Sequence, residues 1–318
     1  MILKFYYKYY NELPLGIHNI KLRDLYLLRN DISELTWFFE EYIYLVEVDL
    51  NDPGTSFNKS EYGEFTCNKF NILEKYSLLD LSTFNNIGIK KVYINPCESE
   101  DEKFINFIHV LNESNIELYF SDNLMYNASL GGYTNLLDLY FIYGHKIPLN
   151  GKEIDGASTY CNIKSLNWWI NSGLELKYSE ESLSFYRGIN EKFILEVLNW
   201  WIDSGLEIKY GNKFIKLLSS NNYIHTLDLL LSHRLKIVCD EEIMDYISVY
   251  GGVEILNWWL NSGIKLNYTE KSIDSVISHR NEKTLKWWIN SGLKLKYTKA
   301  FVLGSKKWLK EIGVYHYF

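Results

Sequence analysis

Apolar and polar residues follow two patterns along this chain, and the two patterns recur together. Apolar residues at helical spacing are followed by about five residues of alternating polarity, which predicts a helix leading into a short extended connector. In the copy that ends at Gly205, for example, Val197, Leu198, Trp201 and Ile202 fall on one side of a helix. Four helical segments are nearly identical in sequence: Leu166–Gly173, Leu198–Gly205, Leu256–Gly263 and Leu285–Gly292.

The glycine that closes each segment recurs at intervals of about 29 residues, and this interval reveals weaker copies of the unit. A residue that ends a helix often adopts a left-handed conformation, which Gly adopts easily and Asn tolerates. Arg234 falls at the same position and departs from this rule. The interval from Gly173 to Gly205 is 32 residues, with the extra residues near 188–193. We predict that helices end at Gly88, Asn115, Gly144, Gly173, Gly205, Gly263, Gly292 and Gly313.

A further helix is predicted before each of these helices. Residues 240–249 and 269–277 open with Asp240 and Thr269, which can cap a helix, and acidic residues follow in the first turn. One helix hairpin cannot bury its apolar face alone, so neighbouring hairpins must stack. We therefore predict a mostly α protein whose residues 75–318 form a helix-pair solenoid of about 8–9 units, the last of them truncated.

Residues 1–74 lack the repeat and are predicted to form a small α+β N-terminal cap. Residues 25–41 favour a strand or turn followed by a helix, and Ile43–Leu50 alternates like a half-buried strand. Residues 51–67 are typical of a polar loop. Because the end of a stack of repeats exposes apolar surface, we expect this cap to cover the first unit.

Two segments, residues 250–267 (YGGVEILNWWLNSGIKLN) and 131–144 (GGYTNLLDLYFIYG), resemble the second helix of an ankyrin repeat. The TPLH segment of that family is absent, and the unit is about four residues shorter than the ankyrin norm. The resemblance thus implies an ankyrin-like solenoid with a trimmed edge. Residues 43–52 (IYLVEVDLND) and 72–79 (ILEKYSLL) are similar to the N-terminal part of ankyrin-repeat proteins from amoebal giant viruses of the mimivirus group.

Adjacent tryptophans occur four times in the predicted second helices. Exposed aromatic pairs can stack on a ligand such as a nucleic-acid base. Both positions of the corresponding apolar pair face the core in ankyrin repeats, so the resemblance implies that the tryptophans pack between stacked helices. The residues concerned are Trp168, Trp169, Trp200, Trp201, Trp258, Trp259, Trp287 and Trp288.

The formal net charge of −7 argues against a general nucleic-acid or anionic-membrane binder. The charge is unevenly distributed, because residues 271–318 carry ten Lys/Arg against three Asp/Glu, whereas residues 96–125 carry seven acids and one Lys. The basic residues are either the solvated face of a terminal repeat or a contact for an acidic partner, which could be residues 96–125 of a second copy in weak self-association. The candidate contact residues are Lys294, Lys296, Lys299, Lys306, Lys307 and Lys310.

The four cysteines form no CxxC pair, and the seven histidines show no metal-ligand spacing. With no signal peptide and no apolar stretch of about 18 residues, the sequence predicts an intracellular protein without a membrane span. Motifs of nucleotide-binding loops, serine hydrolases and zinc proteases are absent from the sequence. We therefore predict no catalytic, cofactor-binding or metal-binding residue.

These observations together predict a non-enzymatic scaffold for protein–protein interaction. The giant-virus resemblance implies a host or viral protein as the partner and the host cytoplasm, or the virion, as its location. Two alternatives stay open. One is a structural or virion component that associates through its oppositely charged ends. The other is an adaptor to host ubiquitin ligases, since Leu13 and Pro14 ahead of a predicted helix resemble the start of an F-box.

Overall fold

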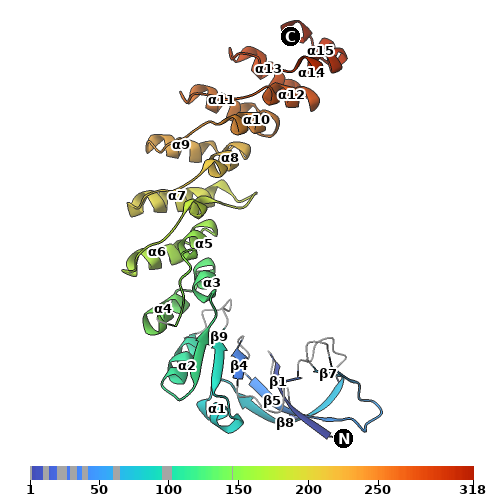
Figure 1. Cartoon of the computed structure of the whole chain (residues 1–318), viewed down its shortest axis with the longest axis vertical. Coiled ribbons are helices and arrows are strands. Elements are labelled where there is room, and N and C mark those ends of the chain that lie inside the picture. Colours follow the sequence, from blue (N-terminus) through green and yellow to red (C-terminus); the bar gives the residue numbers. More distant parts are fainter. Residues whose placement is uncertain are drawn as a thin grey trace. The chain divides into compact units, whose positions relative to one another are not determined.

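The computed structural model describes residues 2–9, 14–19, 27–28, 34–37, 42–59, 65–94, 102–144 and 146–318. The chain divides into two compact units. Unit 1 comprises residues 1–153 with 167–172, and unit 2 comprises residues 154–166 with 173–318. Figure 1 shows strands at the start of the chain and helices over the rest. The predicted mostly α class is confirmed.

Unit 1 contains a seven-stranded sheet of order β2-β8-β5-β1-β3-β7-β6, in which every neighbouring pair is antiparallel. In the interior strand β5, Ile43, Val46 and Val48 are fully buried, as the predicted half-buried strand requires. The strands are β1 (Ile2–Tyr9), β2 (Gly16–Asn19), β3 (Leu27–Leu28), β5 (Tyr42–Asp49), β6 (Phe57–Lys59), β7 (Phe65–Cys67) and β8 (Lys69–Ser77).

Three predictions for this region are wrong. The predicted polar loop of residues 51–67 contains strands β6 and β7, which pair with each other. The helix expected within residues 25–41 is a strand at Glu34–Trp37 (β4), and much of the remaining segment lies outside the described residues. Pro14 leads into strand β2 instead of the helix that an F-box start requires, and Leu13 lies outside the described residues. Both segments satisfy their backbone hydrogen bonds through sheet neighbours, β9 for β4 and β8 for β2.

Helices and strands alternate over the next 40 residues, so the helix pairs begin at Leu124, later than the predicted residue 75. Strands β9 (Lys91–Ile94) and β10 (Glu117–Phe120) run parallel, with β4 on the far side of β9. Helices α1 (Leu81–Ile87) and α2 (Glu102–Asn112) precede β9 and β10 respectively, and parallel strands need such crossovers. Gly88 ends α1 as predicted, with φ 78°.

The last pair of unit 1 consists of α3 (Leu124–Gly131) and α4 (Thr134–Tyr143), which contact each other. Helices α5 (Glu153–Thr159) and α6 (Ile163–Asn171) follow along the chain. The pair after them is incomplete, because its first helix is reduced to a 3₁₀ turn, η1 (Glu180–Leu183), before the long helix α7 (Glu191–Ser204). The extra residues of the 32-residue interval lie between η1 and α7.

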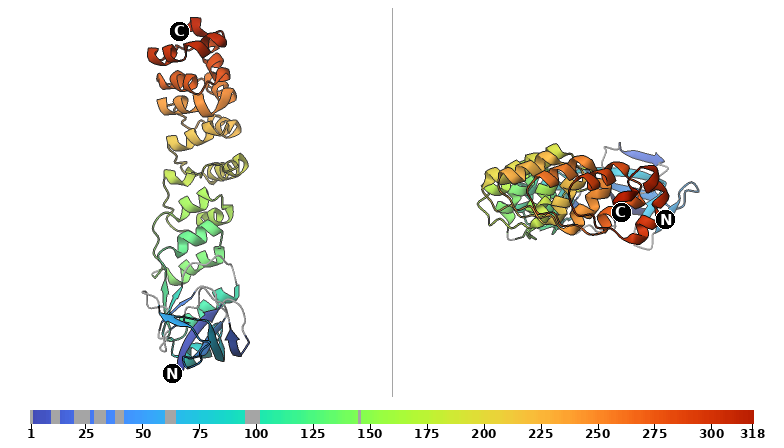
Figure 2. Two further views of the ribbon diagram at one scale, coloured as in Figure 1. Left: turned by 90° about the vertical axis from the view of Figure 1, so that its right-hand side faces the viewer. Right: turned by 90° about the horizontal axis from the view of Figure 1, so that it is seen from above.

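The remaining helix pairs of unit 2 lie in successive layers (Figures 1 and 2). First helices contact first helices, α8 with α10, α10 with α12 and α12 with α14, and second helices contact second helices, α7 with α9 and α11 with α13. The pairs are α8 (Asn212–Ser220) with α9 (Ile224–Ser232), α10 (Glu241–Tyr250) with α11 (Gly252–Asn261), α12 (Lys271–Ser278) with α13 (Glu282–Asn290), and α14 (Lys299–Gly304) with α15 (Lys306–Glu311); a short turn, η2 (Tyr315–Tyr317), follows.

Most of the predicted helix-ending glycines adopt the left-handed conformation: Gly88, Gly173, Gly205, Gly263, Gly292 and Gly313. Gly144 does not, since its φ of −51° is right-handed and helical. Asn115 lies in the turn between α2 and β10 without a positive φ, because a strand and not a connector follows it. Arg234 keeps the left-handed conformation, with φ 54°, despite its Cβ.

No helix that the structure describes combines the length and the apolar character that crossing a membrane requires.

Candidate binding surface

The second tryptophan of each pair is buried, and its indole N–H donates to a serine hydroxyl in an earlier first helix. Trp259 donates to Ser219 over 3.1 Å and Trp288 to Ser248 over 3.2 Å. The corresponding bonds from Trp169 to Ser129 and from Trp201 to Ser158 measure 2.9 Å each. A buried indole needs such an acceptor, so these bonds fix which first helix lies beneath each second helix.

Where the second tryptophan is replaced, its serine partner is missing too. Leu230 and Leu309 occupy the tryptophan position in α9 and α15, and both are fully buried. Ser219 and Ser248 are 29 residues apart, and a further 29 residues along the chain the unit that precedes α15 has the buried Ile277. The unit that precedes α9 has only the turn η1 in place of a full first helix. Leucine thus replaces the second tryptophan in units whose preceding unit has no serine hydroxyl to accept an indole hydrogen bond.

The first tryptophan of each pair corrects the prediction that both residues face the core. Trp168, Trp200 and Trp258 are half-buried, and only Trp287 is buried, with 8% of its surface exposed. Trp168 and Trp258 donate to the carboxylates of Asp138 and Asp228, and Trp287 donates to the Asn257 side chain, each over 2.7 Å. The indole edges therefore join neighbouring second helices at the surface and do not form an open aromatic platform.

Four connectors of unit 2 end in a tyrosine whose hydroxyl donates to a later backbone carbonyl, whereas the connector of residues 235–239 ends in Cys239. The hydroxyl of Tyr178 donates to the carbonyl of Glu207 over 3.0 Å, and that of Tyr268 donates to Lys294 over 2.9 Å. Tyr210 and Tyr297 donate in the same way to the carbonyls of Lys236 and Phe318. Burial raises the pKa of Tyr178, Tyr210 and Tyr268, so these hydroxyls stay protonated as donors. The expected extended connectors are therefore present, tied by side chains.

The residue before the tyrosine forms a second set of contacts, which point back to the preceding connector. The ammonium of Lys296 donates to the carbonyl of Tyr268 over 2.7 Å and lies 4.6 Å from the centre of its ring. Lys209 lies 4.5 Å from the ring of Tyr178 and 3.4 Å from its carbonyl oxygen. Asn267 donates to the carbonyl of Cys239 over 3.0 Å. Each of these three connectors therefore covers the one before it.

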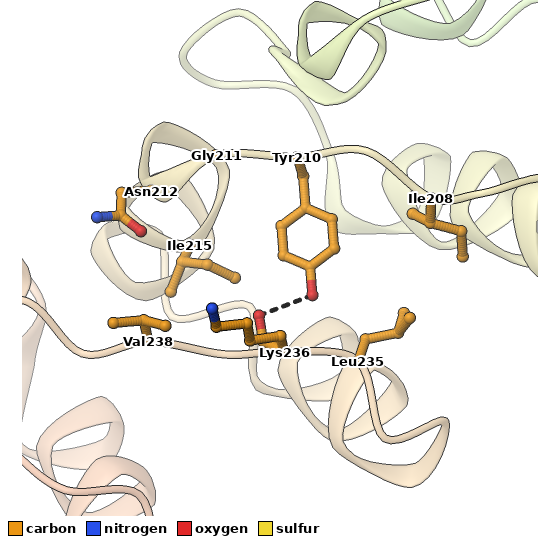
Figure 3. Close-up of a pocket in the computed structure, with 8 residues that line it drawn as sticks. All are labelled: Ile208, Tyr210, Gly211, Asn212, Ile215, Leu235, Lys236 and Val238. Carbon is orange, nitrogen blue, oxygen red and sulfur yellow. Dashed lines mark hydrogen bonds between the residues drawn. The ribbon is translucent and has the colours of Figure 1, made fainter.

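One connector breaks this series. Val238 stands where Lys209, Asn267 and Lys296 stand in the other connectors, and it has no side-chain donor. A pocket of about 300 Å³ opens at this point (Figure 3). Figure 3 shows the Tyr210 ring standing between Ile208 and Ile215 with its hydroxyl on the carbonyl of Lys236. The other lining residues are Gly211, Asn212, Leu235 and Val238.

The first helices carry a second exposed group of side chains. Lys216 on α8 lies 3.5 Å from the carboxylate of Glu242 and 4.9 Å from the ring centre of Tyr246 on α10. Tyr246 packs on Tyr250, which is 59% exposed and whose ring centre lies 6.3 Å from that of His279, the residue that follows α12. An aromatic and charged strip therefore runs across three successive first helices.

Of the predicted acidic-partner residues, Lys296 is engaged with Tyr268 and is a structural residue. The ammonium groups of Lys306 and Lys310 both lie over the ring of Tyr315, at 5.5 and 5.7 Å from its centre. Lys294, Lys299, Lys306, Lys307 and Lys310 are exposed. In the acidic segment that could face them, residues 95–101 lie outside the described residues.

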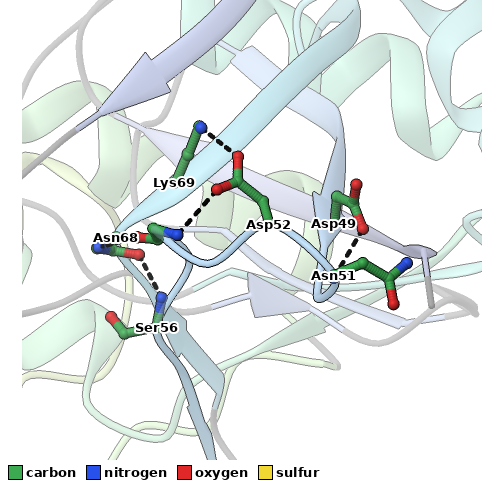
Figure 4. A network of polar contacts seen from close by, with 7 residues as sticks. Asp49, Asn51, Asp52, Ser56, Asn68 and Lys69 are labelled. Atoms are coloured by element: carbon green, nitrogen blue, oxygen red, sulfur yellow. Dashed lines mark hydrogen bonds and ion pairs between the residues drawn. The ribbon is translucent and has the colours of Figure 1, made fainter.

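The most extensive polar network of the first sheet holds a loop and not a ligand (Figure 4). Asn68 accepts from the backbone of Ser56 over 2.6 Å and donates to the carbonyl of Gly54 over 2.9 Å. Asp52 accepts from the backbone of Gly54 and pairs with Lys69, whose hydrogen bond lowers the pKa of that carboxyl. A pocket of about 230 Å³ lies beside this loop. The described residues bring no three His, Cys, Asp or Glu side chains together as metal ligands.

No protein-family model matches the chain, and no match was found among curated proteins or among solved structures.

Proposed function

We propose that this protein is a non-enzymatic scaffold that binds another protein through an ankyrin-like solenoid of helix pairs. The observation that carries the proposal is the contrast between repeated and unrepeated positions in unit 2. The buried Trp–Ser pairs and the Tyr–carbonyl bonds recur from one helix pair to the next. The strip of Tyr246, Tyr250 and His279 and the pocket at Tyr210 occur on this background once each. A scaffold with a uniform core and locally distinct surface suits recognition of a particular partner.

The first-helix strip is the surface that we propose for the partner. Exposed tyrosines supply large contact area with little loss of side-chain entropy, which makes them effective in interfaces. The neighbouring Lys216 and Glu242 add charges at its rim. The resemblance of the sequence to ankyrin-repeat proteins of amoebal giant viruses supports a host or viral protein as the partner and the infected cell as the setting.

Affinity capture with surface variants tests this proposal. The full chain is used as bait against amoebal host lysate, beside a Tyr246→Ala/Tyr250→Ala variant and a matched control, Lys192→Ala/Glu196→Ala, which removes an exposed ion pair of the second helix α7. We expect a partner that binds the wild type and the control at equal strength and binds the tyrosine variant at least tenfold more weakly. A partner that is insensitive to the tyrosines would place the contact on another face.

Self-association is a second candidate, which the exposed basic residues of α14 and α15 support. Beside Lys299, Lys306 and Lys307, Leu303 exposes 63% of its surface and Phe301 exposes 44%. If this end binds another copy, sedimentation velocity of the full chain at 50 mM salt will show a concentration-dependent dimer that dissociates at about 500 mM, as screening of exposed charges predicts. A monomer at low salt and high concentration would exclude this association.

A further inference from the structure

We infer that the pocket at Tyr210 is an empty ammonium site, which accepts a lysine side chain from a partner polypeptide. The inference deepens the proposed scaffold function, because it names a side chain that the scaffold takes. It rests on a comparison between connectors of the same chain, two of which hold a lysine of their own at the equivalent place.

The two filled sites define what the empty one accepts. Lys209 and Lys296 each place an ammonium 4.5–4.6 Å from the ring centre of the tyrosine one connector earlier, within hydrogen-bond reach of that tyrosine's carbonyl oxygen. The face of a tyrosine ring attracts a cation, and the carbonyl oxygen accepts an N–H bond from it. Ring and carbonyl together therefore form a two-point ammonium site.

The third tyrosine, Tyr210, has the same position in its connector and the same hydroxyl bond to the next connector. Its covering residue is Val238, which ends at two methyl groups and has no ammonium to place over the ring. The space that a lysine side chain fills at the other sites is here a pocket of about 300 Å³. Figure 3 shows Tyr210, Ile215 and Val238 around this space, with the side chain of Lys236 drawn between them.

The walls of the pocket fit the stem of a lysine as well as its charge. Ile208, Ile215 and Val238 offer apolar surface along which methylene groups pack, with the charged end directed to the tyrosine. Lys236 lines the same pocket, and two lysines beside one tyrosine have a parallel elsewhere in the chain. At the filled Tyr268 site the residue equivalent to Lys236 is Lys294, and there both Lys294 and Lys296 are present.

The filled and empty sites also explain why the guest has to come from another chain. The lysine that covers Tyr178 or Tyr268 comes from the connector that follows it, 31 or 28 residues along the chain. The connector that follows Tyr210 offers Val238 at this position and therefore leaves the site open. A basic peptide also suits the formal net charge of −7.

Methyl NMR of the full chain with n-butylammonium as the probe tests the site, with 1-butanol as the neutral compound of similar shape. We expect saturable shifts at Ile208, Ile215 and Val238, with butylammonium binding about two- to fivefold more tightly than butanol, the ratio that an exposed cation–π contact supplies. Tyr210→Leu should abolish this preference while the apolar walls remain. Equal binding of the two probes to the wild type, or no saturable shift, would overturn the inference.

Two further variants make the test independent of a loss of folding. Val238→Lys supplies the missing lysine from within the chain and should remove the saturable response to butylammonium. Lys209→Val should produce a second responding site at Tyr178, which is a gain that a damaged protein cannot give. If Lys209→Val adds no site, the comparison between connectors is wrong. A negative result with these small probes leaves the capture experiment and its tyrosine strip unaffected, so the two proposals fail separately.

Discussion

The indole N–H of Trp288 donates to the hydroxyl of Ser248 over 3.2 Å, from the second helix of one pair to the first helix of the pair before it. Both side chains are fully buried. The serine hydroxyl in turn donates to the carbonyl of Met244 over 2.6 Å, so the indole, the hydroxyl and the carbonyl form a short chain of hydrogen bonds. The buried indole N–H has its acceptor only while Ser248 is present.

Replacement of Ser248 by Ala should therefore lower the free energy of unfolding by about 1–3 kcal/mol, because it leaves a buried indole N–H without an acceptor. Urea denaturation followed by tryptophan fluorescence measures the change. Ser278→Ala, at an exposed serine near the end of α12, is the matched control and should change stability by less than about 0.5 kcal/mol. Equal effects of the two substitutions would show that the indole bond contributes nothing.

The pairing of Ile277 with Leu309 elsewhere in the chain predicts a compensation. Trp288→Leu alone removes buried volume and takes the indole donor away from the hydroxyl of Ser248. Trp288→Leu together with Ser248→Ile recreates the pairing of a leucine with an isoleucine that is found in the last two helix pairs. We expect the double variant to be more stable than the sum of the single variants by about 1 kcal/mol or more, a coupling that a double-mutant cycle measures. Additive effects would mean that the two positions are independent.

Lys294 and Lys296 lie two residues apart in one connector and should respond differently to the same substitution. Lys296→Met loses both the carbonyl bond and the ring contact with Tyr268, so we expect a loss of about 1 kcal/mol in the free energy of unfolding. Lys294→Met alters an exposed side chain and should stay within about 0.5 kcal/mol of the wild type. Thermal denaturation of both variants in the same buffer tests this difference.

Arg234 and Gly263 occupy equivalent helix ends with the same left-handed backbone, at φ 54° and 76°. Because a Cβ is strained in this conformation, we expect Arg234→Gly to stabilise the protein by about 0.5–1 kcal/mol. The reciprocal change, Gly263→Arg, should destabilise it by about 1 kcal/mol or more. Stabilisation by both substitutions, or by neither, in chemical denaturation would contradict this account of the helix ends.

The buried thiol of Cys239 predicts a pH dependence of stability. Burial raises the pKa of this thiol from its ordinary value of 9.0 to about 11, so the folded state holds the proton more tightly than the unfolded state does. The resulting stabilisation is complete below pH 9 and is lost as the pH rises from 9 to 11. The Cys239→Ala variant should therefore lose less stability than the wild type between pH 9 and pH 11. Parallel curves for the two proteins would show that the thiol does not titrate in this range.

The helix ends and repeat spacing of unit 2 could be predicted because they depend on short-range chemistry. Gly205, Gly263 and Gly292 end helices for a reason that each residue carries by itself, and Asp240 caps α10 by accepting from the backbone of Ile243. What the sequence did not reveal is which tryptophan of a pair donates to a buried serine. That depends on the serine about 40 residues earlier, a partner that no local pattern identifies.

The segments before Leu124 show where the periodicity misled the prediction. Residues 116–120 (IELYF) closely resemble the connector of residues 174–178 (LELKY) and follow Asn115 as that connector follows Gly173. In β10, however, Leu118 and Phe120 are buried and the backbone pairs in parallel with β9. Alternating polarity predicts an extended segment in both cases. Whether that segment pairs with other strands in a sheet depends on which segments lie beside it in space. The polarity pattern of one segment does not contain this information.

The candidate site was missed for a related reason. A valine such as Val238 is an ordinary residue in an extended connector. Its lack of a side-chain donor becomes significant only by comparison with the lysines of other connectors, which contact Tyr178 and Tyr268. The alternation of the connectors was visible, with Lys209 and Lys296 before their tyrosines. The direction in which those lysines point depends on how successive connectors lie beside each other in the fold.

The near-identity of the Trp–Ser pairs has a consequence for how the chain reaches its native state. Several helix pairs carry the same buried indole. During folding, one helix pair can therefore pack on a unit that is not its native neighbour and still find a serine acceptor for its indole N–H. Such frame-shifted assemblies are kinetic traps, a recognised hazard for repeated sequences. Leu230 and Leu309 have no N–H that could donate to a serine hydroxyl. In an assembly shifted by one unit, a serine would face a leucine at these places. The two exceptions in the series thereby mark the correct frame.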